Sequence, residues 1–271
     1  YFAWLHLMYP HDPWRGARRP GASPGAFRCD AGRDRRAEIL AAYDDEVRRA
    51  DEAVGRVAKA VDAAGHASDT WIVVVSDHGQ AFWEHGLCGH GNSLYDEQLR
   101  VVLLVVPPRG TSFTPGRVAM PVSLVDLHPT LLDLAGAPAD DVDGRSLLRF
   151  LRPGSAERPG LSFAEEPRLT PAQGPPKNPL AATVIDPPWK LLRDPADPAP
   201  TPPRLFDVSA DPGEHHDLAP ARGDVAAHLS DTLRAHVESQ TARRRAAAAP
   251  RAPAPLSAET RSRLRELGYL R

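Results

Sequence analysis

The sequence is poor in cysteine, in net charge and in long apolar runs. Its 271 residues include two cysteines, Cys29 and Cys88, which excludes a disulfide-dense scaffold, and their spacing matches no zinc motif. Lys and Arg number 33 against 35 Asp and Glu, so the formal net charge is −2 and the basic excess of a nucleic-acid-coating protein is absent. No run of about 18 apolar residues occurs, so this sequence holds no membrane-spanning helix.

The first residue is Tyr1 rather than Met, and the chain opens inside an apolar run over residues 1–8. A natural amino terminus rarely begins within a buried strand, so we expect the sequence to be the downstream part of a longer protein. The lack of a signal peptide then says nothing of the compartment, because the segment that would carry it is not in this sequence.

Strands and helices are predicted to alternate along the first part of the chain. Apolar residues recur at three- and four-residue steps in the helices, and short β-branched runs are typical of strands buried on both faces. This order is typical of an α/β domain with a largely parallel sheet, over residues 1–152. The predicted strands are residues 1–8, 71–75 and 101–106, and the predicted helices are residues 40–61 and 124–134.

The composition changes after residue 152, with 14 prolines among residues 153–203. Residues 153–245 are predicted to form a small domain of short antiparallel strands with one helix. Residues 246–271 are predicted to be a flexible Ala/Pro spacer and a short terminal helix. The predicted strands of this domain are 182–185, 189–192 and 205–208, and Val225, Leu229, Leu233 and Val237 share one face of its helix.

Ser76-Asp77-His78-Gly79 stands directly after the predicted strand 71–75. Open α/β sheets bind ligands at the carboxyl ends of their strands, so this position favours a site. A carboxylate oxygen and an imidazole nitrogen side by side can ligate one cation, and Gly79 allows the backbone to turn. The tripeptide alone is also consistent with a strand-to-loop turn whose Asp caps nearby amides.

The neighbouring motifs, taken in order, resemble those of the sulfatase family of the alkaline phosphatase superfamily, and the resemblance spans nearly all of the chain. It implies an α/β, alkaline-phosphatase-like fold with a mostly parallel sheet flanked by helices and a small α+β carboxyl-terminal domain. The motifs are Pro10-His11-Asp12-Pro13-Trp14, Asp77-His78-Gly79, Gly89-His90-Gly91, Leu94-Tyr95-Asp96-Glu97, Leu99-Arg100-Val101, Gly144-Arg145-Ser146, Trp189-Lys190-Leu191 and Asp211-Pro212-Gly213-Glu214.

Carried over position by position, the resemblance implies that Asp77 and His78 are two ligands of one divalent cation. The His form leaves the metal open among Ca²⁺, Mg²⁺ and Mn²⁺, of which we expect Ca²⁺. His11 would hold the sulfate ester or protonate its leaving oxygen. His90 stands where many relatives carry a sulfate-binding Lys, and a protonated imidazole would supply the same charge. Both histidines are also consistent with ordinary loop residues, and His85 is expected to be structural.

The resemblance places the nucleophile, a formylglycine matured from Cys or Ser, upstream of the His11 motif and outside this sequence. Cys29-Asp30-Ala31-Gly32-Arg33 fits the nucleophile motif loosely, but it follows the His11 motif and lacks the proline, so we reject it. We therefore expect a metal-dependent sulfuric ester hydrolase that acts on a small-molecule or glycan sulfate ester, and we expect these 271 residues to be inactive alone.

Two alternatives stay open at this point. A phosphodiester or phosphonate monoester hydrolase of the same superfamily would use the same Asp-His-Gly motif. An inactive fragment that packs against a partner would use none of this chemistry. By resemblance alone, the protein is expected outside the cytoplasm, either periplasmic or secreted.

Overall fold

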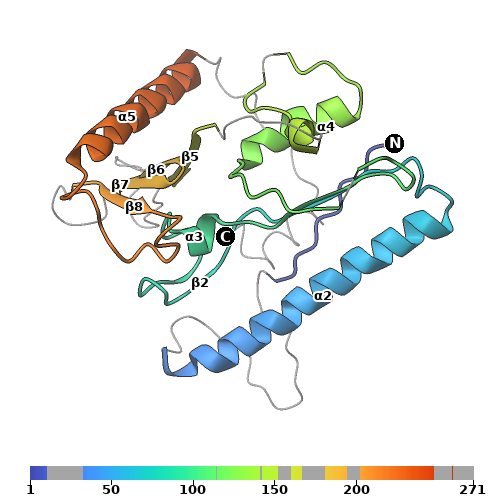
Figure 1. Ribbon diagram of the computed structural model, residues 1–271. Helices are drawn as coiled ribbons and strands as arrows, with labels where there is room; N and C mark the ends of the chain where they lie inside the picture. The colour runs from blue at the N-terminus through green and yellow to red at the C-terminus, as the bar shows by residue number, and fades with distance from the viewer. Residues whose placement is uncertain are drawn as a thin grey trace. The chain divides into compact units, whose positions relative to one another are not determined.

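The computed structural model describes residues 1–10, 33–113, 115–140, 142–151, 160–166, 181–193, 202–246 and residue 258 (Figure 1). The chain divides into two compact units, Tyr1–Ser230 and Asp231–Arg271. The site described below lies within the first unit. The domain boundaries that the sequence predicts after residues 152 and 245 stay predictions, and the predicted terminal helix lies almost wholly outside the described residues.

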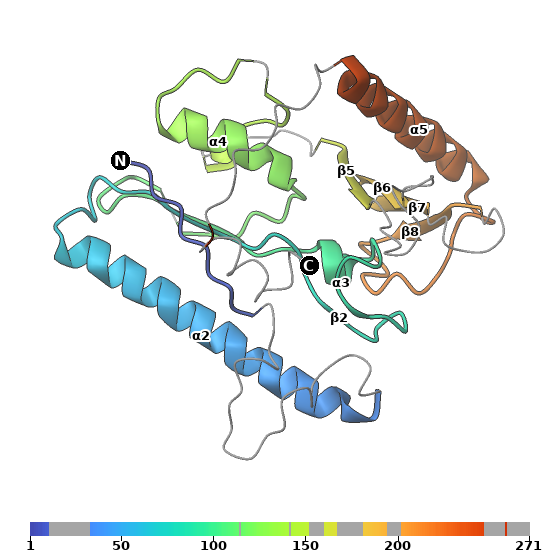
Figure 2. The ribbon, with the colours of Figure 1, turned by 180° about the vertical axis from the view of Figure 1, so that it is seen from behind.

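The long helix predicted over residues 40–61 is confirmed as α2 (Arg36–Ala63), which follows the 3-10 turn η2 (Arg33–Arg35). Its apolar positions recur on one face, and Ile39 on that face is fully buried. The helix ends before Gly65, whose φ of +80° is favourable for glycine because it has no Cβ. Figures 1 and 2 show α2 as one continuous helix.

The strands predicted around residues 71–75 and 101–106 form as β1 (Ile72–Val75) and β4 (Leu103–Val106). They pair antiparallel, with Ile72 opposite Val106 and Val75 opposite Leu103. Every strand pair among the described residues is antiparallel, whereas the sequence pattern predicted a largely parallel sheet. The physical reason is that the chain between β1 and β4 folds into a short hairpin and one helical turn and re-enters the sheet at the end where it left, whereas parallel neighbours need a crossover to the opposite end.

Burial of β1 and β4 on both faces was predicted, and this is wrong for the described structure. Each residue of β1 is half-buried, and in β4 the side chains of Leu104 and Val106 are 54% and 47% exposed. Residues 1–8 form no strand and are mostly exposed, Trp4 to 71%. Among the described residues, β1 and β4 pair only with each other and residues 1–8 pair with no strand. A side chain is buried only where another element packs over it, so a short apolar run does not by itself bury a strand.

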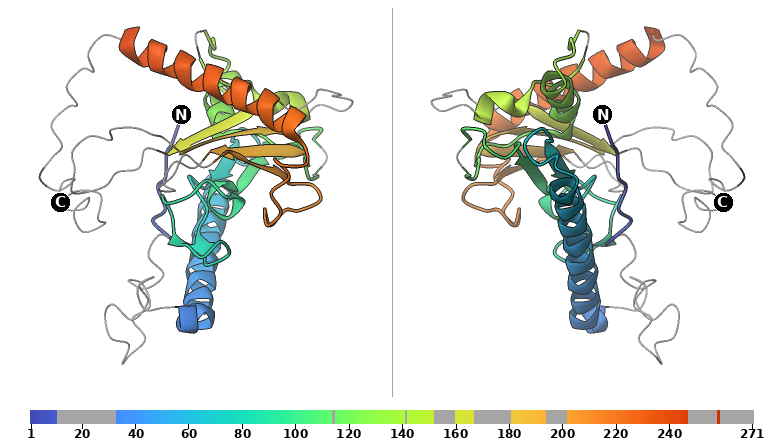
Figure 3. Two further views of the ribbon diagram at one scale, coloured as in Figure 1. Left: turned by 90° about the vertical axis from the view of Figure 1, so that its left-hand side faces the viewer. Right: turned by 90° about the vertical axis from the view of Figure 1, so that its right-hand side faces the viewer.

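The carboxyl-terminal sheet has the strand order β5-β6-β7-β8 and is antiparallel throughout (Figure 3). Short apolar runs bounded by Asp-Pro turns predicted three of its strands, and β5, within the proline-rich stretch, was missed. Fully buried side chains from the three predicted strands form its core, among them Val184, Leu191 and Leu205. The strands are β5 (Ser162–Glu166), β6 (Ala181–Asp186), β7 (Trp189–Arg193) and β8 (Arg204–Asp207).

The remaining helices match the sequence pattern. The 124–134 helix is confirmed as the 3-10 turn η3 (Leu124–Asp126) continuing into α4 (Leu127–Leu134), and Ser123 caps η3 by accepting from the Val125 amide. A second 3-10 turn, η4, covers Leu147–Leu151. The carboxyl-terminal helix is confirmed as α5 (Gly223–Ala246), and Leu229 on its predicted apolar face is buried.

Candidate functional site

A turn directly after β1 carries Asp77 and His78. The Asp77 carboxylate accepts a hydrogen bond from the His78 amide at 3.0 Å, which fixes its position beside the imidazole. The Nδ1 atom of His78 lies 2.8 Å from the Gly79 carbonyl oxygen and donates to it, because a carbonyl can only accept. This bond sets the tautomer, so the lone pair of His78 is on Nε2, which lies 3.7 Å from Asp77 Oδ1.

His90 is brought to the same place by a short hairpin. Strands β2 (Ala81–Phe82) and β3 (Cys88–Gly89) pair antiparallel, so the chain that leaves His78 returns beside it one residue before His90. The His78 and His90 rings stack with centroids 4.1 Å apart. Nδ1 of His90 lies 2.8 Å from Gln80 Oε1, so this nitrogen donates to the amide oxygen. The pairing of His90 with Gln80 was not predicted from the sequence.

Asp77 and His78 fit part of a divalent cation site. Their oxygen and nitrogen are close enough to ligate one ion, and the Asp77 side chain is 74% exposed, so an ion can reach it. The carbonyl bond on Nδ1 is the arrangement that metal-ligating histidines use to orient the ring. Within the part of the chain that the structure describes, no group of three or more His, Cys, Asp or Glu side chains could hold a metal ion. The two residues therefore supply a partial ligand set.

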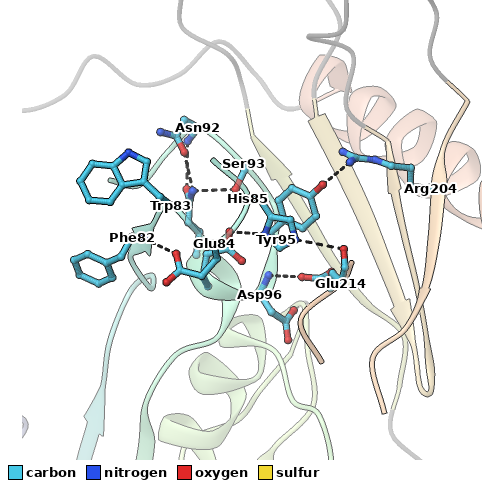
Figure 4. Close-up of polar contacts among 12 residues, drawn as sticks. Phe82, Trp83, Glu84, His85, Asn92, Ser93, Tyr95, Asp96, Arg204 and Glu214 are labelled. Carbon is cyan, nitrogen blue, oxygen red and sulfur yellow. Dashed lines mark hydrogen bonds and ion pairs between the residues drawn. The ribbon is translucent and has the colours of Figure 1, made fainter. Parts of the chain in front are cut away.

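Helix α3 (Asp96–Leu99) lies behind the turn after β1. It is hydrogen-bonded both to the segment that carries His78 and to the segment that follows His90. The Gly79 amide donates to the Gln98 carbonyl at 2.8 Å, next to His78. The buried side chain of Gln98 donates to Asn92 Oδ1 at 2.7 Å and to Ser93 Oγ at 2.9 Å, just after His90 (Figure 4). This single helical turn therefore contacts both segments of the candidate site. Its role was not predicted, although Leu-Tyr-Asp-Glu marked its position.

A buried charge cluster lies on the other side of α3. Lys190 on β7 has a fully buried side chain, and its ammonium lies 2.8 Å from Asp96 Oδ1 and 2.6 Å from Glu214 Oε1. The second Glu214 oxygen accepts from the Asp96 amide at 2.6 Å (Figure 4). Burial raises the pKa of Glu214, and the charge of Lys190 opposes that rise. We call these three residues the Lys190 cluster.

His85 is held beside this cluster and makes structural contacts, as expected. Its Nδ1 lies 2.9 Å from Glu97 Oε1, and its Nε2 lies 3.3 Å from the Glu214 carbonyl oxygen. Its ring stacks on Tyr95 with centroids 3.5 Å apart, and Arg204 on β8 donates to the Tyr95 hydroxyl (Figure 4). The His85 side chain is therefore a link between the loop and the sheet.

A small hollow elsewhere in the first unit shares no residue with this site. It has a volume of about 200 Å³, and Asp126 and Arg145 line it. The Asp126 carboxylate accepts from the Arg145 amide at 2.8 Å and from the Ser123 amide at 3.1 Å. Because both carboxylate oxygens of Asp126 bond backbone amides, the hollow has the character of a capped turn.

The predicted site residues thus divide into two groups. Asp77, His78 and His90 lie close together after β1, and their roles in one site stay a prediction. His11 and the rejected Cys29 lie outside the described residues. Among the helices that the structure describes, none combines the length and the apolar character needed to cross a membrane.

Comparisons with a family profile and with curated proteins both find similarity to sulfatases. Residues 1–137 match the profile of the family described as Sulfatase. The chain is 34% identical over 254 residues to steryl-sulfatase of Mus musculus, with 78% of this chain and 39% of the relative covered. It is 30% identical over 205 residues to arylsulfatase K of Xenopus laevis, with 74% and 37% covered.

A solved structure, the phosphonate monoester hydrolase from Silicibacter pomeroyi, matches with a TM-score of 0.62 at 28% identity. The match covers 80% of this chain and 43% of that one. The chain therefore spans about two fifths of the length of the relatives that it matches.

Proposed function

Because the chain belongs to the sulfatase family and has an alkaline-phosphatase-like fold, we propose that it carries part of the active site of a sulfuric ester hydrolase. The observation that carries this proposal is the gathering of Asp77, His78 and His90 after β1. These are the residue types that a metal-dependent hydrolase of a sulfate ester needs, since the ester is an anion whose transition state spreads negative charge over its oxygens.

We assign Asp77 and His78 as ligands of one divalent cation. A bound cation would supply positive charge to the oxygens of the ester. The carboxylate of Asp77 favours a hard ion, and Ca²⁺ is the metal that we propose, with Mg²⁺ and Mn²⁺ as alternatives. Gly79 orients the His78 ring through its carbonyl, which leaves Nε2 as the ligating atom.

His90 is assigned to the sulfate group. Its Nδ1 is engaged by Gln80, so the contact to the ester is made by Nε2, which donates a proton when the ring is charged. His11 is proposed, from the family motif that surrounds it, to hold the ester or to protonate its leaving oxygen. The formylglycine nucleophile of the family would come from a segment that is not among these 271 residues.

A phosphonate monoester hydrolase is the second candidate, because one of the solved structures similar to this chain is a phosphonate monoester hydrolase. The two candidates are separated by assaying the complete protein on an aryl sulfate and on an aryl phosphonate with the same leaving group. A kcat/KM at least tenfold higher for the sulfate supports the proposal, and a preference for the phosphonate overturns it. Asp77→Asn, assayed in parallel, tells whether the observed turnover depends on this site.

For the substrate we propose only a chemical class, and for the compartment only that it lies outside the cytoplasm. A small-molecule or glycan sulfate ester fits the family, and the mixed charge of the chain does not favour nucleic acid. An extracytoplasmic location is proposed from the family alone. Fractionation of cells that express the complete protein, followed by detection of this chain, tests it directly.

A further inference from the structure

Lys190 is a fully buried lysine on a strand of the carboxyl-terminal sheet, about 110 residues downstream of the candidate metal ligands. Burying an ammonium without partners is very costly, so lysines are rarely fully buried unless they are paired. Neither partner of Lys190 lies in the sheet itself. Asp96 is the first residue of α3, and Glu214 is in the turn after β8. The charge of Lys190 is thus balanced partly by α3, the helix behind the candidate site, and partly by the turn after β8.

Glu214 also contacts α3 directly, because its other carboxylate oxygen accepts from the Asp96 amide at 2.6 Å. That amide is the first of the helix and has no partner within it, so Glu214 acts as an N-terminal cap supplied from a distant segment. Glu214 itself has a φ of +53°, an uncommon conformation for a residue with a Cβ. The turn therefore holds Glu214 in an unusual backbone geometry that places both of its oxygens on the cluster.

From α3 the connections continue to the two parts of the site. The Gln98 carbonyl accepts from the amide of Gly79, which neighbours His78, and the Gln98 side chain bonds Asn92, two residues after His90. A displacement of α3 would therefore move His78 and His90 relative to one another. Their rings lie only 4.1 Å apart, so a small displacement changes their geometry.

We propose that Lys190 and Glu214 are positioning residues of the reaction: through Asp96 they anchor α3 to the carboxyl-terminal sheet and so fix the relative placement of His78 and His90. Neither residue touches the ester. The proposal rests on the proposed function for its catalytic consequence, but its structural part stands on the contacts above. It gives the small carboxyl-terminal sheet a role in the activity without a catalytic side chain of its own.

The test compares three variants of the complete protein. Lys190→Met keeps the length of the side chain and removes its charge, and Glu214→Gln keeps the shape of the cap and removes its charge. Leu191→Ala is the matched control, since Leu191 is the next residue on β7, is fully buried and, as a neighbour on a strand, has its side chain on the face opposite that of Lys190. It weakens the same sheet by leaving a cavity.

We expect Lys190→Met and Glu214→Gln to lower kcat roughly 10- to 100-fold, the range that small misplacements of reacting groups produce, with KM changed less than about threefold. Leu191→Ala, assayed well below its unfolding temperature, should keep kcat within about twofold. Hydrogen–deuterium exchange provides a readout that needs no turnover. The amides of Gly79 and Asp96 should exchange faster in the two charge variants than in Leu191→Ala.

Equal exchange at these amides in Lys190→Met and Leu191→Ala would overturn the proposal, because the cluster would then only stabilise the sheet. Unchanged kcat with faster exchange would overturn it as well. If Lys190→Met does not fold, Glu214→Gln decides, since it leaves Lys190 paired with Asp96. If the complete protein hydrolyses no sulfate ester, the proposed function fails, while the exchange comparison still tests the anchor.

Discussion

The closest backbone packing in the candidate site is that of Gly79 against α3, and replacing this glycine by alanine tests it. A Cβ built on Gly79 would fall well inside 3.0 Å of the Glu97 carbonyl oxygen, 3.0 Å from its carbon and 3.1 Å from the Arg100 carbonyl oxygen. All three are backbone atoms, so no flexible side chain can move aside. The turn and the helix must separate to accommodate the new methyl group.

The magnitude follows from two effects. Forcing one extra carbon into a closely packed region costs about 1–3 kcal/mol. Separation also weakens the 2.8 Å bond from the Gly79 amide to the Gln98 carbonyl, worth about 1 kcal/mol net. We therefore expect Gly79→Ala to lower the free energy of unfolding by about 2–4 kcal/mol. The same separation moves His78, so activity should fall together with stability.

The measurement is urea unfolding of the complete protein, followed by near-ultraviolet circular dichroism, with Gly55→Ala as the control. Gly55 lies within α2, and nothing lies within 4 Å of a Cβ built there. Alanine should therefore stabilise the protein at Gly55, by about 0.5–1 kcal/mol, because it is the better helix former. A Gly79→Ala variant as stable as the parent would refute the packing argument, and so would equal destabilisation by both variants.

Three further predictions concern the metal, the core and pH. Asp77→Asn should strongly weaken divalent-cation binding, measured by isothermal titration with Ca²⁺, and unchanged affinity would remove the ligand assignment. Leu205→Ala should lower the free energy of unfolding by about 2–5 kcal/mol, because its side chain is fully buried between the strands, and a loss below about 1 kcal/mol would contradict this. Hydrogen bonds from the His216 and His215 amides hold the pKa of Asp211 below its usual value of 3.8. The stabilisation that ionised Asp211 gives the folded protein is therefore fully present above pH 3.8 and is lost as pH falls through the lowered pKa. In urea unfolding, Asp211→Asn should be less stable than the parent at pH 7, and the difference in stability should shrink as pH falls below about 4. A stability difference that stays constant with pH would contradict the assignment.

The sequence alone determined those features that depend on local periodicity and on short motifs. The three- and four-residue spacing in α2, the short apolar runs of β6 to β8 and the turn residue Gly65 each depend on neighbours within a few positions, so they could be identified without a fold. Asp77-His78-Gly79 was placed correctly at the end of β1 for the same reason. The family was identified because several short motifs occur in one order.

The tertiary structure decided those features that depend on which distant segments meet. A lysine on a strand is ordinarily exposed, and nothing near Lys190 in the sequence indicates that Asp96 and Glu214 will enclose it. Composition likewise indicated that β4 would be buried on both faces, but burial depends on what covers a strand, and Leu104 is 54% exposed. Local sequence sets which conformations a segment favours, whereas burial and the pairing of charges are set by the neighbours that folding brings to it.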